Sequence, residues 1–391
     1  MPNSENIKNK KFIESFAEET HGDFYATRRY ILDNQANEST IDSNEEKIPV
    51  DIHGETIQID KSKNLKPELD RVFNQGPLFR YFLDGSRKTY KIGDISYNNR
   101  PYPIICGQIA VACVERVSPS KFKCRRDTSH KKTILSVPST SVAEEDLELT
   151  RQTLLKKSNF KYDFTIDHIF TYDGRPQTDE NKPYENRAIA RIQEVMIDTE
   201  KAIVIQLSKQ NLLSENKYLI KDGSLEYSNR GRGKYVDLWK IKDFYKSVVG
   251  VSKNFNPEAL ASNRKYRKIA DNIASLPLFH RTPAFQYQSK HTDEQIYFSV
   301  WYLRIRDRYS KFSSPFDGVI KVEKILVTED EMDNGLITDE VDLISTNLLI
   351  ERNPTTFGKE SRWHSHLYPI YVTESYVKSM FHSSSFFMNS I

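Results

Sequence analysis

The chain has 391 residues, of which 38% are hydrophobic and 28% charged, and its mean hydropathy is −0.64. This composition excludes a fibrous or wholly disordered protein and fits one large α/β domain with an extension, or two domains. The 57 basic and 54 acidic residues give a net charge of +3, so any nucleic-acid surface must be local.

The first residues contain no apolar signal segment, and the longest apolar run, residues 104–114, is too short to span a membrane. The three cysteines, Cys106, Cys113 and Cys124, form no C-x-x-C pair. We therefore expect a cytoplasmic protein that does not associate with membranes and has no cysteine zinc site or disulfide framework.

Residues 1–76 are polar and are predicted to form a partly helical N-terminal extension, with a helix near 6–19 and a strand near 50–59. A second unit, residues 77–391, begins with strand-like runs at 78–83, 87–95 and 104–117. Because Asp-Gly favours the positive φ of hairpin turns, we expect a tight turn after the first run and an antiparallel meander of three strands.

An insertion is predicted at about 118–182, and the elements that follow it alternate between helix and strand. Within the insertion we expect a basic loop (121–132), a helix (142–157) and a strand (162–172). Beyond it we expect helices at 185–213, 236–247, 257–275, 339–350 and 373–381, and strands at 218–220, 248–251, 296–305 and 319–327.

The same tripeptide occurs twice in this glycine-poor chain, as Asp84-Gly85-Ser86 and Asp222-Gly223-Ser224. Either tripeptide alone most often forms a turn. Their places at the predicted ends of the first and fourth core strands would bring Asp84 close to Asp222, at an edge where α/β sheets carry functional groups. Two adjacent carboxylates repel each other unless a cation separates them, and Mg²⁺ or Mn²⁺ favours such oxygen ligands.

Other acids could complete a metal site of this kind. Glu194 on the long predicted helix is one candidate, although Glu200 could be chosen instead. Glu374 lies on the last predicted helix, where it could also simply favour the helix dipole. Two metal ions held by such acids would stabilise the attacking and leaving oxygens of phosphodiester hydrolysis. Acids in this order along the chain are typical of an RNase H-like nuclease.

The sequence resembles the NurA family of DNA nucleases, which have an RNase H-like (PIWI-like) core. The resemblance runs from about residue 78 to 385. The segments that carry it are 82–86, 191–194, 219–225, 249–253 and 368–370. It implies an α/β fold with an RNase H-like mixed sheet flanked by helices, and a DNA exonuclease or endonuclease that depends on a divalent metal.

By that resemblance, Asp84 and Asp222 would bind Mn²⁺ or Mg²⁺, with Glu194 as the third acid on the helix. The family has a histidine near the start of its last helix, where this chain has Thr373 and Glu374. Glu374 could serve as the fourth group, and His364 and His366 are alternatives.

The resemblance also implies a homodimer that works with a HerA-type hexameric ATPase in DNA repair, as DNA end processing, or in antiphage defence. The chain has no Walker A motif, so the ATP hydrolysis would come from the partner. Because the family histidine is missing, the alternative is a catalytically degenerate, RNase H-like DNA-binding subunit that caps an ATPase ring. A guide-dependent PIWI-like nuclease fits less well, since the chain has no evident room for a guide-end domain.

Basic residues near aromatic ones are candidates for contacts with nucleic acid. Lys253 is the strongest single candidate for a nucleic-acid contact, because it follows a core strand near the proposed site. The other candidates are Arg230, Arg232, Lys234, Arg264 and Lys265. A further cluster of Trp, Tyr and Arg lies at 301–309. Each cluster could equally be an ordinary solvated surface.

Overall fold

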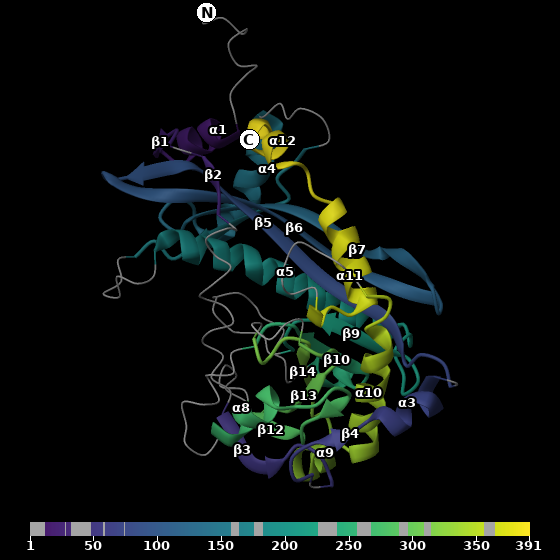
Figure 1. Ribbon diagram of the computed structural model, residues 1–391. Helices are drawn as coiled ribbons and strands as arrows, with labels where there is room; N and C mark the ends of the chain where they lie inside the picture. Colours follow the sequence, from purple (N-terminus) through teal and green to yellow (C-terminus); the bar gives the residue numbers. More distant parts are fainter. Residues whose placement is uncertain are drawn as a thin grey trace, which may run out of the picture.

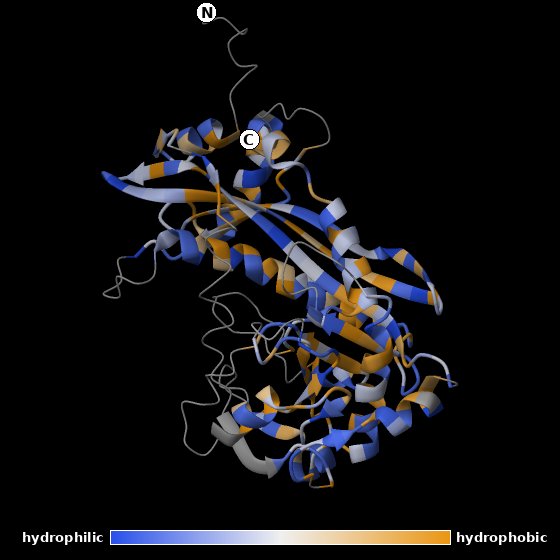
Figure 2. Cartoon of the chain, in the orientation of Figure 1, coloured by the Kyte–Doolittle hydropathy of each residue, from blue (hydrophilic) through white to orange (hydrophobic). Residues whose placement is uncertain are grey.

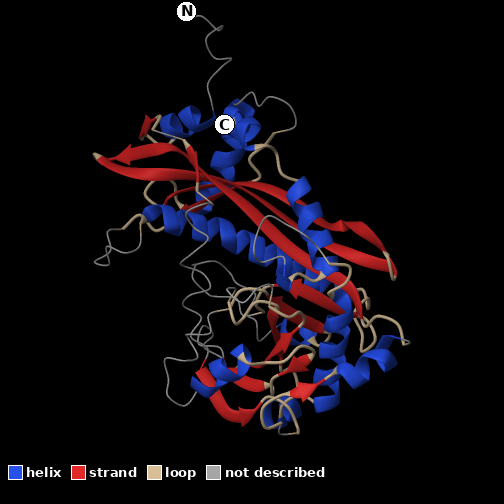
Figure 3. Cartoon of the chain, viewed as in Figure 1, coloured by secondary structure: helices blue, strands red, loops and turns tan. Residues whose placement is uncertain are grey.

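The structure is a computed structural model, and its elements are shown in Figures 1 and 3. It describes residues 12–27, 29–32, 48–57, 59–73, 75–157, 164–175, 183–225, 241–255, 267–288, 296–308, 314–355 and 364–391. The described residues form a mixed sheet with helices packed against it, which confirms the predicted α/β class.

The longest strands of the sheet form an antiparallel meander: β5 (Phe79–Tyr97), β6 (Arg100–Ser118) and β7 (Lys121–Pro138). The short strand β9 (Tyr218–Asp222) pairs in parallel with β5, and β10 (Val248–Ser252) pairs in parallel with β9. The order β7-β6-β5-β9-β10 is therefore an antiparallel meander followed by two strands parallel to its first member. This is an RNase H-like arrangement, but its meander is not built from the three strands predicted at 78–83, 87–95 and 104–117: the first two of these belong to β5 and the third to β6.

Further strands extend the sheet at both ends. They are β8 (His168–Tyr172), parallel to β7, and, beyond β10, β14 (Val319–Ile325), β13 (Tyr297–Arg304), β12 (Phe285–Gln288) and β3 (Ile48–His53). The predicted strand pair at 296–305 and 319–327 is confirmed by the antiparallel ladder between β13 and β14. Four short strands lie off this path: β1 (Asp23–Tyr25), β2 (Tyr30–Ile31), β4 (Lys63–Asn64) and β11 (His280–Arg281).

The hairpin turn predicted at Asp84-Gly85-Ser86 is wrong, because β5 continues through this tripeptide without a break. The chain reverses instead at Asn98 and Asn99, whose φ angles are +52° and +62°. Asparagine tolerates this left-handed conformation better than most residues, so the pair suits a tight hairpin. The predicted basic loop at 121–132 is also wrong, since these residues belong to β7, the third strand of the meander.

Two helices pack on opposite faces of the meander. The long helix α5 (Tyr184–Lys209) covers one face, where a Cβ on Gly107 of β6 would lie 2.8 Å from Ile192 of α5. Helix α11 (Tyr368–Ser379) covers the other face, where Ala110 and Ala112 pack against its residue Val377. Since side chains alternate along a strand, odd-numbered residues in this part of β6 face α5 and even-numbered ones face α11.

The remaining helical segments lie around this core. They are α1 (Phe12–Glu19), α3 (Lys66–Phe73), η1 (Glu144–Asp146), α4 (Leu147–Lys157), η2 (Lys242–Tyr245), α8 (Arg267–Ala274), α9 (Glu329–Asn334), α10 (Thr338–Glu351) and α12 (Ser384–Ser390). The helix predicted at 236–247 and the basic helix predicted at 257–275 lie partly outside the described residues.

The described residues of the first 76 belong to the same folded body. Strand β3 pairs with β12, and β4 pairs with β11. Helices α1 and α12, from opposite ends of the chain, contribute Phe12 and Phe387 to one buried cluster. Hydrophobic residues concentrate in β9 and β10 at the middle of the sheet (Figure 2), and nearly all residues of these two strands are buried. Among the described residues, no helix combines the length and the apolar character needed to cross a membrane.

Candidate functional site

Asp84 and Asp222 are neighbours on adjacent parallel strands. Leu83 of β5 pairs with Lys221 of β9, so the two aspartates occupy the next position of each strand. Asp84 pairs with Ala112 of β6 and therefore faces α11. It is 7% exposed, and burial, followed by the negative charge of Asp222, raises the pKa of Asp84 well above its usual range. The pair predicted from the two tripeptides is thus brought together, although Asp84 lies within a strand rather than at its end.

Lys253 and Glu374 complete this group, which we call the carboxylate cluster: Asp84, Asp222, Glu374 and Lys253. The Lys253 Nζ atom lies 3.1 Å from Asp222 Oδ2 and 3.5 Å from Glu374 Oε2. Burial lowers the pKa of Lys253, but the charges of Asp222, Glu374 and Asp84 raise it above its usual value. Burial raises the pKa of Glu374, yet Lys253 and the neighbouring Lys378 bring it below its usual value. The ammonium of Lys253 therefore interacts electrostatically with all three carboxylates of the cluster.

The two glycines of the Asp-Gly-Ser tripeptides are required for different reasons. Gly85 has a strand conformation, and a Cβ there would collide with the carboxylate of Glu200 and lie 3.2 Å from Met196, both on α5. Gly223 has a φ of +89°, which a residue with a side chain rarely adopts. Its N–H donates to the Val251 carbonyl at 2.8 Å, so this bond joins the end of β9 to the neighbouring strand β10. The second tripeptide therefore lies where β9 ends, as the sequence predicts.

On the α5 side of the sheet, Glu200 and Lys221 form a buried ion pair of 3.1 Å. The Lys221 ammonium also donates to the carbonyls of Asp222 (3.0 Å) and Ser224 (3.2 Å), so the pair holds the backbone of the second tripeptide. Burial raises the pKa of Glu200, and Lys221 offsets only part of that rise. The helical acid that approaches the tripeptides is thus Glu200, which lies beneath the carboxylate cluster rather than within it.

Glu323 of β14 anchors the chain just after β9 and was not predicted from the sequence. Its fully buried carboxylate accepts hydrogen bonds from the Ser224 hydroxyl at 2.8 Å and the Leu225 N–H at 2.9 Å. It also forms an ion pair of 2.7 Å with Lys321. No local motif marks Glu323, because its role depends on the pairing of β14 with β10.

Glu194, predicted as the third acid of the metal site, does not join the carboxylate cluster. Its carboxylate forms an ion pair of 2.5 Å with Arg191 of the same helix. It lines a cavity on the α5 face, together with His130, Lys132 and His168. This placement corrects the assignment of Glu194 as a ligand beside Asp84.

The two histidines considered for the fourth group lie just before α11. The backbone carbonyls of His364 and His366 both accept from Arg306 Nη1 at 2.9 Å. The His364 ring contacts the Asp307 carbonyl, whereas the charge of His366 is close enough to help lower the pKa of Glu374. Of the three candidates, Glu374 is the one that contacts Lys253.

Of the six basic residues predicted individually to contact nucleic acid, Lys253 is the one whose surroundings are described. Arg230, Arg232, Lys234, Arg264 and Lys265 lie outside the described residues. Most of the described part of the aromatic and basic cluster predicted at 301–309 is buried: Trp301 is fully buried and Arg304 is 3% exposed, whereas Arg308 is exposed and residue 309 lies outside the described residues. The Arg304 guanidinium donates to backbone carbonyls, including that of Asp317 at 2.7 Å.

The carboxylate cluster fits a divalent cation in the chemistry of its donors. Asp84, Asp222 and Glu374 offer hard oxygen ligands, and the buried Glu374 Oε2 has no hydrogen-bond partner among the described residues. In the geometry present, these acids surround the ammonium of Lys253. Within the described ranges, no group of three or more His, Cys, Asp and Glu side chains is already spaced as a metal site. Lys253 thus supplies the positive charge that a metal ion would otherwise bring.

Comparison with known proteins gives no family assignment: no protein-family model matches the chain, and no curated protein matches it.

Proposed function

We propose that this chain is a divalent-metal-dependent nuclease that hydrolyses phosphodiester bonds of DNA. The observation that carries the proposal is the placement of Asp84 beside Asp222 on neighbouring parallel strands of an RNase H-like sheet. A buried acid with a raised pKa beside a second acid destabilises a fold, and such arrangements cluster at functional sites. The resemblance of the motifs around both aspartates to NurA nucleases supports the same activity.

Asp84, Asp222 and Glu374 would hold Mn²⁺ or Mg²⁺. When bound, the ion would activate a water molecule and stabilise the charge that develops on the phosphate. Lys253 lies within 3.5 Å of two of these acids, so its ammonium is placed to neutralise a phosphate oxygen at the same site. Glu200, Lys221 and Glu323 act through the backbone: they hold the chain at the end of β9, which positions Asp222.

Two partners are proposed only because the sequence resembles NurA nucleases. They are a second copy of the chain and a HerA-type hexameric ATPase that would translocate the DNA. The process would be DNA end processing in repair, or defence against phage.

A second candidate function is a catalytically degenerate, DNA-binding subunit that caps an ATPase ring. The position of Lys253 favours it, because an ammonium 3.1 Å from Asp222 neutralises the site without a metal. Calorimetric titration of the full chain with Mn²⁺ separates the two functions. The nuclease requires saturable binding that Asp222→Asn weakens at least about tenfold, equivalent to 1.4 kcal/mol, and that the exposed-site control Asp146→Asn leaves unchanged. Wild-type protein that binds no Mn²⁺, alone or with its ATPase, would favour the degenerate subunit.

A further inference from the structure

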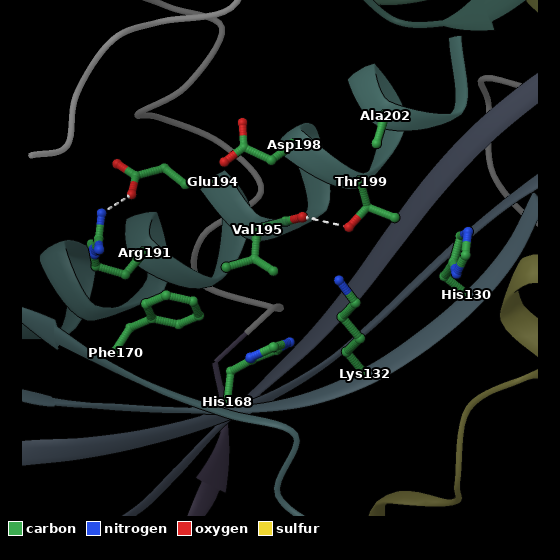
Figure 4. A pocket seen from close by; sticks show the side chains of 10 residues that line it. All are labelled: His130, Lys132, His168, Phe170, Arg191, Glu194, Val195, Asp198, Thr199 and Ala202. Atoms are coloured by element: carbon green, nitrogen blue, oxygen red, sulfur yellow. Dashed lines mark hydrogen bonds and ion pairs between the residues drawn. The ribbon is translucent and has the colours of Figure 1, made fainter. Parts of the chain in front are cut away.

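A cavity of about 420 Å³ lies between α5 and the part of the sheet formed by β7 and β8 (Figure 4). This volume is within the usual range for sites that bind small molecules. The cavity is on the α5 face: His130 in its wall pairs with Val111, an odd-numbered residue of β6. Asp84 faces α11 instead, so the cavity and the carboxylate cluster are on opposite faces of the sheet.

The floor of the cavity is rich in nitrogen. His130 and Lys132 are two residues apart on β7 and so share one face, and His168 lies beside Ile134 on β8 and shares it too. Lys132 points from β7 toward α5 and lies between the two histidines (Figure 4). It forms no ion pair with a carboxylate of the described residues. Burial and the charge of Lys132 lower the pKa of both histidines. An anion would relieve this repulsion.

The roof of the cavity offers different chemistry. Arg191, Glu194 and Asp198 come from successive turns of α5. Glu194 Oε2 accepts from Arg191, but Glu194 Oε1 and Arg191 Nε are buried without a hydrogen-bond partner among the described residues. A buried acceptor without a partner costs free energy, and a ligand with N–H or O–H groups would satisfy it. The Arg191 guanidinium lies 5.4 Å from the centre of the Phe170 ring, which adds flat π surfaces at the same end.

We infer that this cavity binds a 5′-phosphorylated nucleotide. The phosphate lies against Lys132, His130 and His168, and the donors of the base or sugar reach Glu194 Oε1. The flat surfaces of Phe170 and Arg191 suit a planar base. Inorganic phosphate would neutralise the positive charge in the floor of the cavity, but it would leave Glu194 Oε1 in the roof without a hydrogen-bond donor. The inference concerns a second site, and it holds whether or not the carboxylate cluster cleaves DNA.

Calorimetric titration of the full chain with the four nucleoside 5′-monophosphates tests the inference, with adenosine and inorganic phosphate as partial ligands. We expect at least one nucleotide to bind with one site per chain and more tightly than either partial ligand. A 5′-phosphorylated oligonucleotide that competes for the site would show that the phosphate can come from a strand end. Failure to compete would show that the site takes a free nucleotide. A nuclease assay run in parallel keeps this result separate from that of the carboxylate cluster.

Lys132→Ala should weaken nucleotide binding at least about tenfold, whereas Lys131→Ala should leave it unchanged. Lys131 is the matched control, because the next residue along β7 points to the opposite face of the sheet. Glu194→Met should weaken nucleotide binding without weakening that of phosphate, because it removes the acceptor in the roof, and the positive charge of Arg191 that it leaves unpaired does not disfavour an anion. Thermal melts establish that each variant is folded. If Lys132→Ala is not folded, Lys132→Met is tested in its place. The inference is overturned if no nucleotide binds at millimolar concentration, if phosphate binds as tightly, or if both lysine variants bind like the wild type.

Discussion

Asp84 of β5 lies beside Asp222 of β9, one position beyond the paired residues Leu83 and Lys221. Parallel pairing in register puts both carboxylates on the face covered by α11, where Glu374 and Lys253 meet them. Asp84 is consequently buried next to groups of the same charge, so its ionised form is unfavourable in the folded protein. Placing two buried carboxylates side by side is useful to the protein if their negative charge is needed to bind a cation.

Replacing Asp84 by asparagine should raise the thermal stability of the protein at neutral pH. The pKa of Asp84 is higher in the folded state than in the unfolded state, mainly because of burial. Below the unfolded pKa of about 4, Asp84 is neutral in both states and does not oppose folding. As pH rises from there through the folded pKa, the folded protein loses stability because Asp84 must ionise in its buried position. Asn cannot ionise, so the Tm advantage of Asp84→Asn should be small near pH 4 and grow toward pH 7. Thermal melts across this range measure it, with the exposed Asp146→Asn as control. A variant less stable than the wild type at pH 7 would contradict the burial argument.

Binding of Mn²⁺ should strengthen as pH rises, through a range above the ordinary titration of aspartate. A carboxyl group must lose its proton to bind a metal ion, and burial holds the proton of Asp84 to higher pH. Calorimetry in buffers of different ionisation enthalpy should detect proton release on binding. In Asp84→Asn this proton release should disappear. Binding that is equally tight and releases no proton at pH 5 and pH 8 would exclude Asp84 as a ligand.

Lys253→Met should destabilise the protein by about 2–3 kcal/mol at neutral pH, because Asp222 and Glu374 lose their shared, mostly buried cation. Mn²⁺ should restore more stability to this variant than it adds to the wild type. Lys378→Met is the matched control: Lys378 contacts Glu374 at 2.7 Å, but its side chain is 55% exposed, so its loss should cost at most about 0.5 kcal/mol. Chemical denaturation with and without Mn²⁺ measures both effects. Equal stability of Lys253→Met and the wild type would show that Lys253 does not neutralise the cluster.

The two glycines should respond differently to alanine. Gly85→Ala should cost about 1–3 kcal/mol through its collision with Glu200, and should cost less in a chain that already carries Glu200→Ala. Gly223→Ala should cost about 1 kcal/mol or more through its positive φ, and this cost should be the same in a chain that carries Glu200→Ala. A double-mutant cycle by chemical denaturation tests both statements. The same coupling for both glycines would contradict the separate roles given to them.

The two tripeptides show what the sequence could and could not predict. Their order along the chain was sufficient to pair Asp84 with Asp222, because adjacent core strands bring the same positions together. The role of Gly85 was not predictable, since Asp-Gly in a strand looks like a turn unless the helix packed against it is known. The choice between Glu194 and Glu200 had the same difficulty: helical periodicity shows which residues face a sheet, but packing decides which turn of α5 lies over β5. Glu323 depends on a strand pairing between distant segments and has no local signal.

Cleavage of DNA is the most direct test of the central claim. Wild-type protein, supplied with a HerA-type ATPase if the chain alone is inactive, should cleave a linear duplex with Mn²⁺ and not with EDTA. Asp84→Ala and Asp222→Ala should each lower the single-turnover rate at least about a hundredfold, equivalent to 2.7 kcal/mol or more of transition-state stabilisation, while Asp146→Ala should retain the wild-type rate. Cleavage by both variants at the wild-type rate, or no cleavage by the wild type with any divalent ion and its partner, would contradict the account.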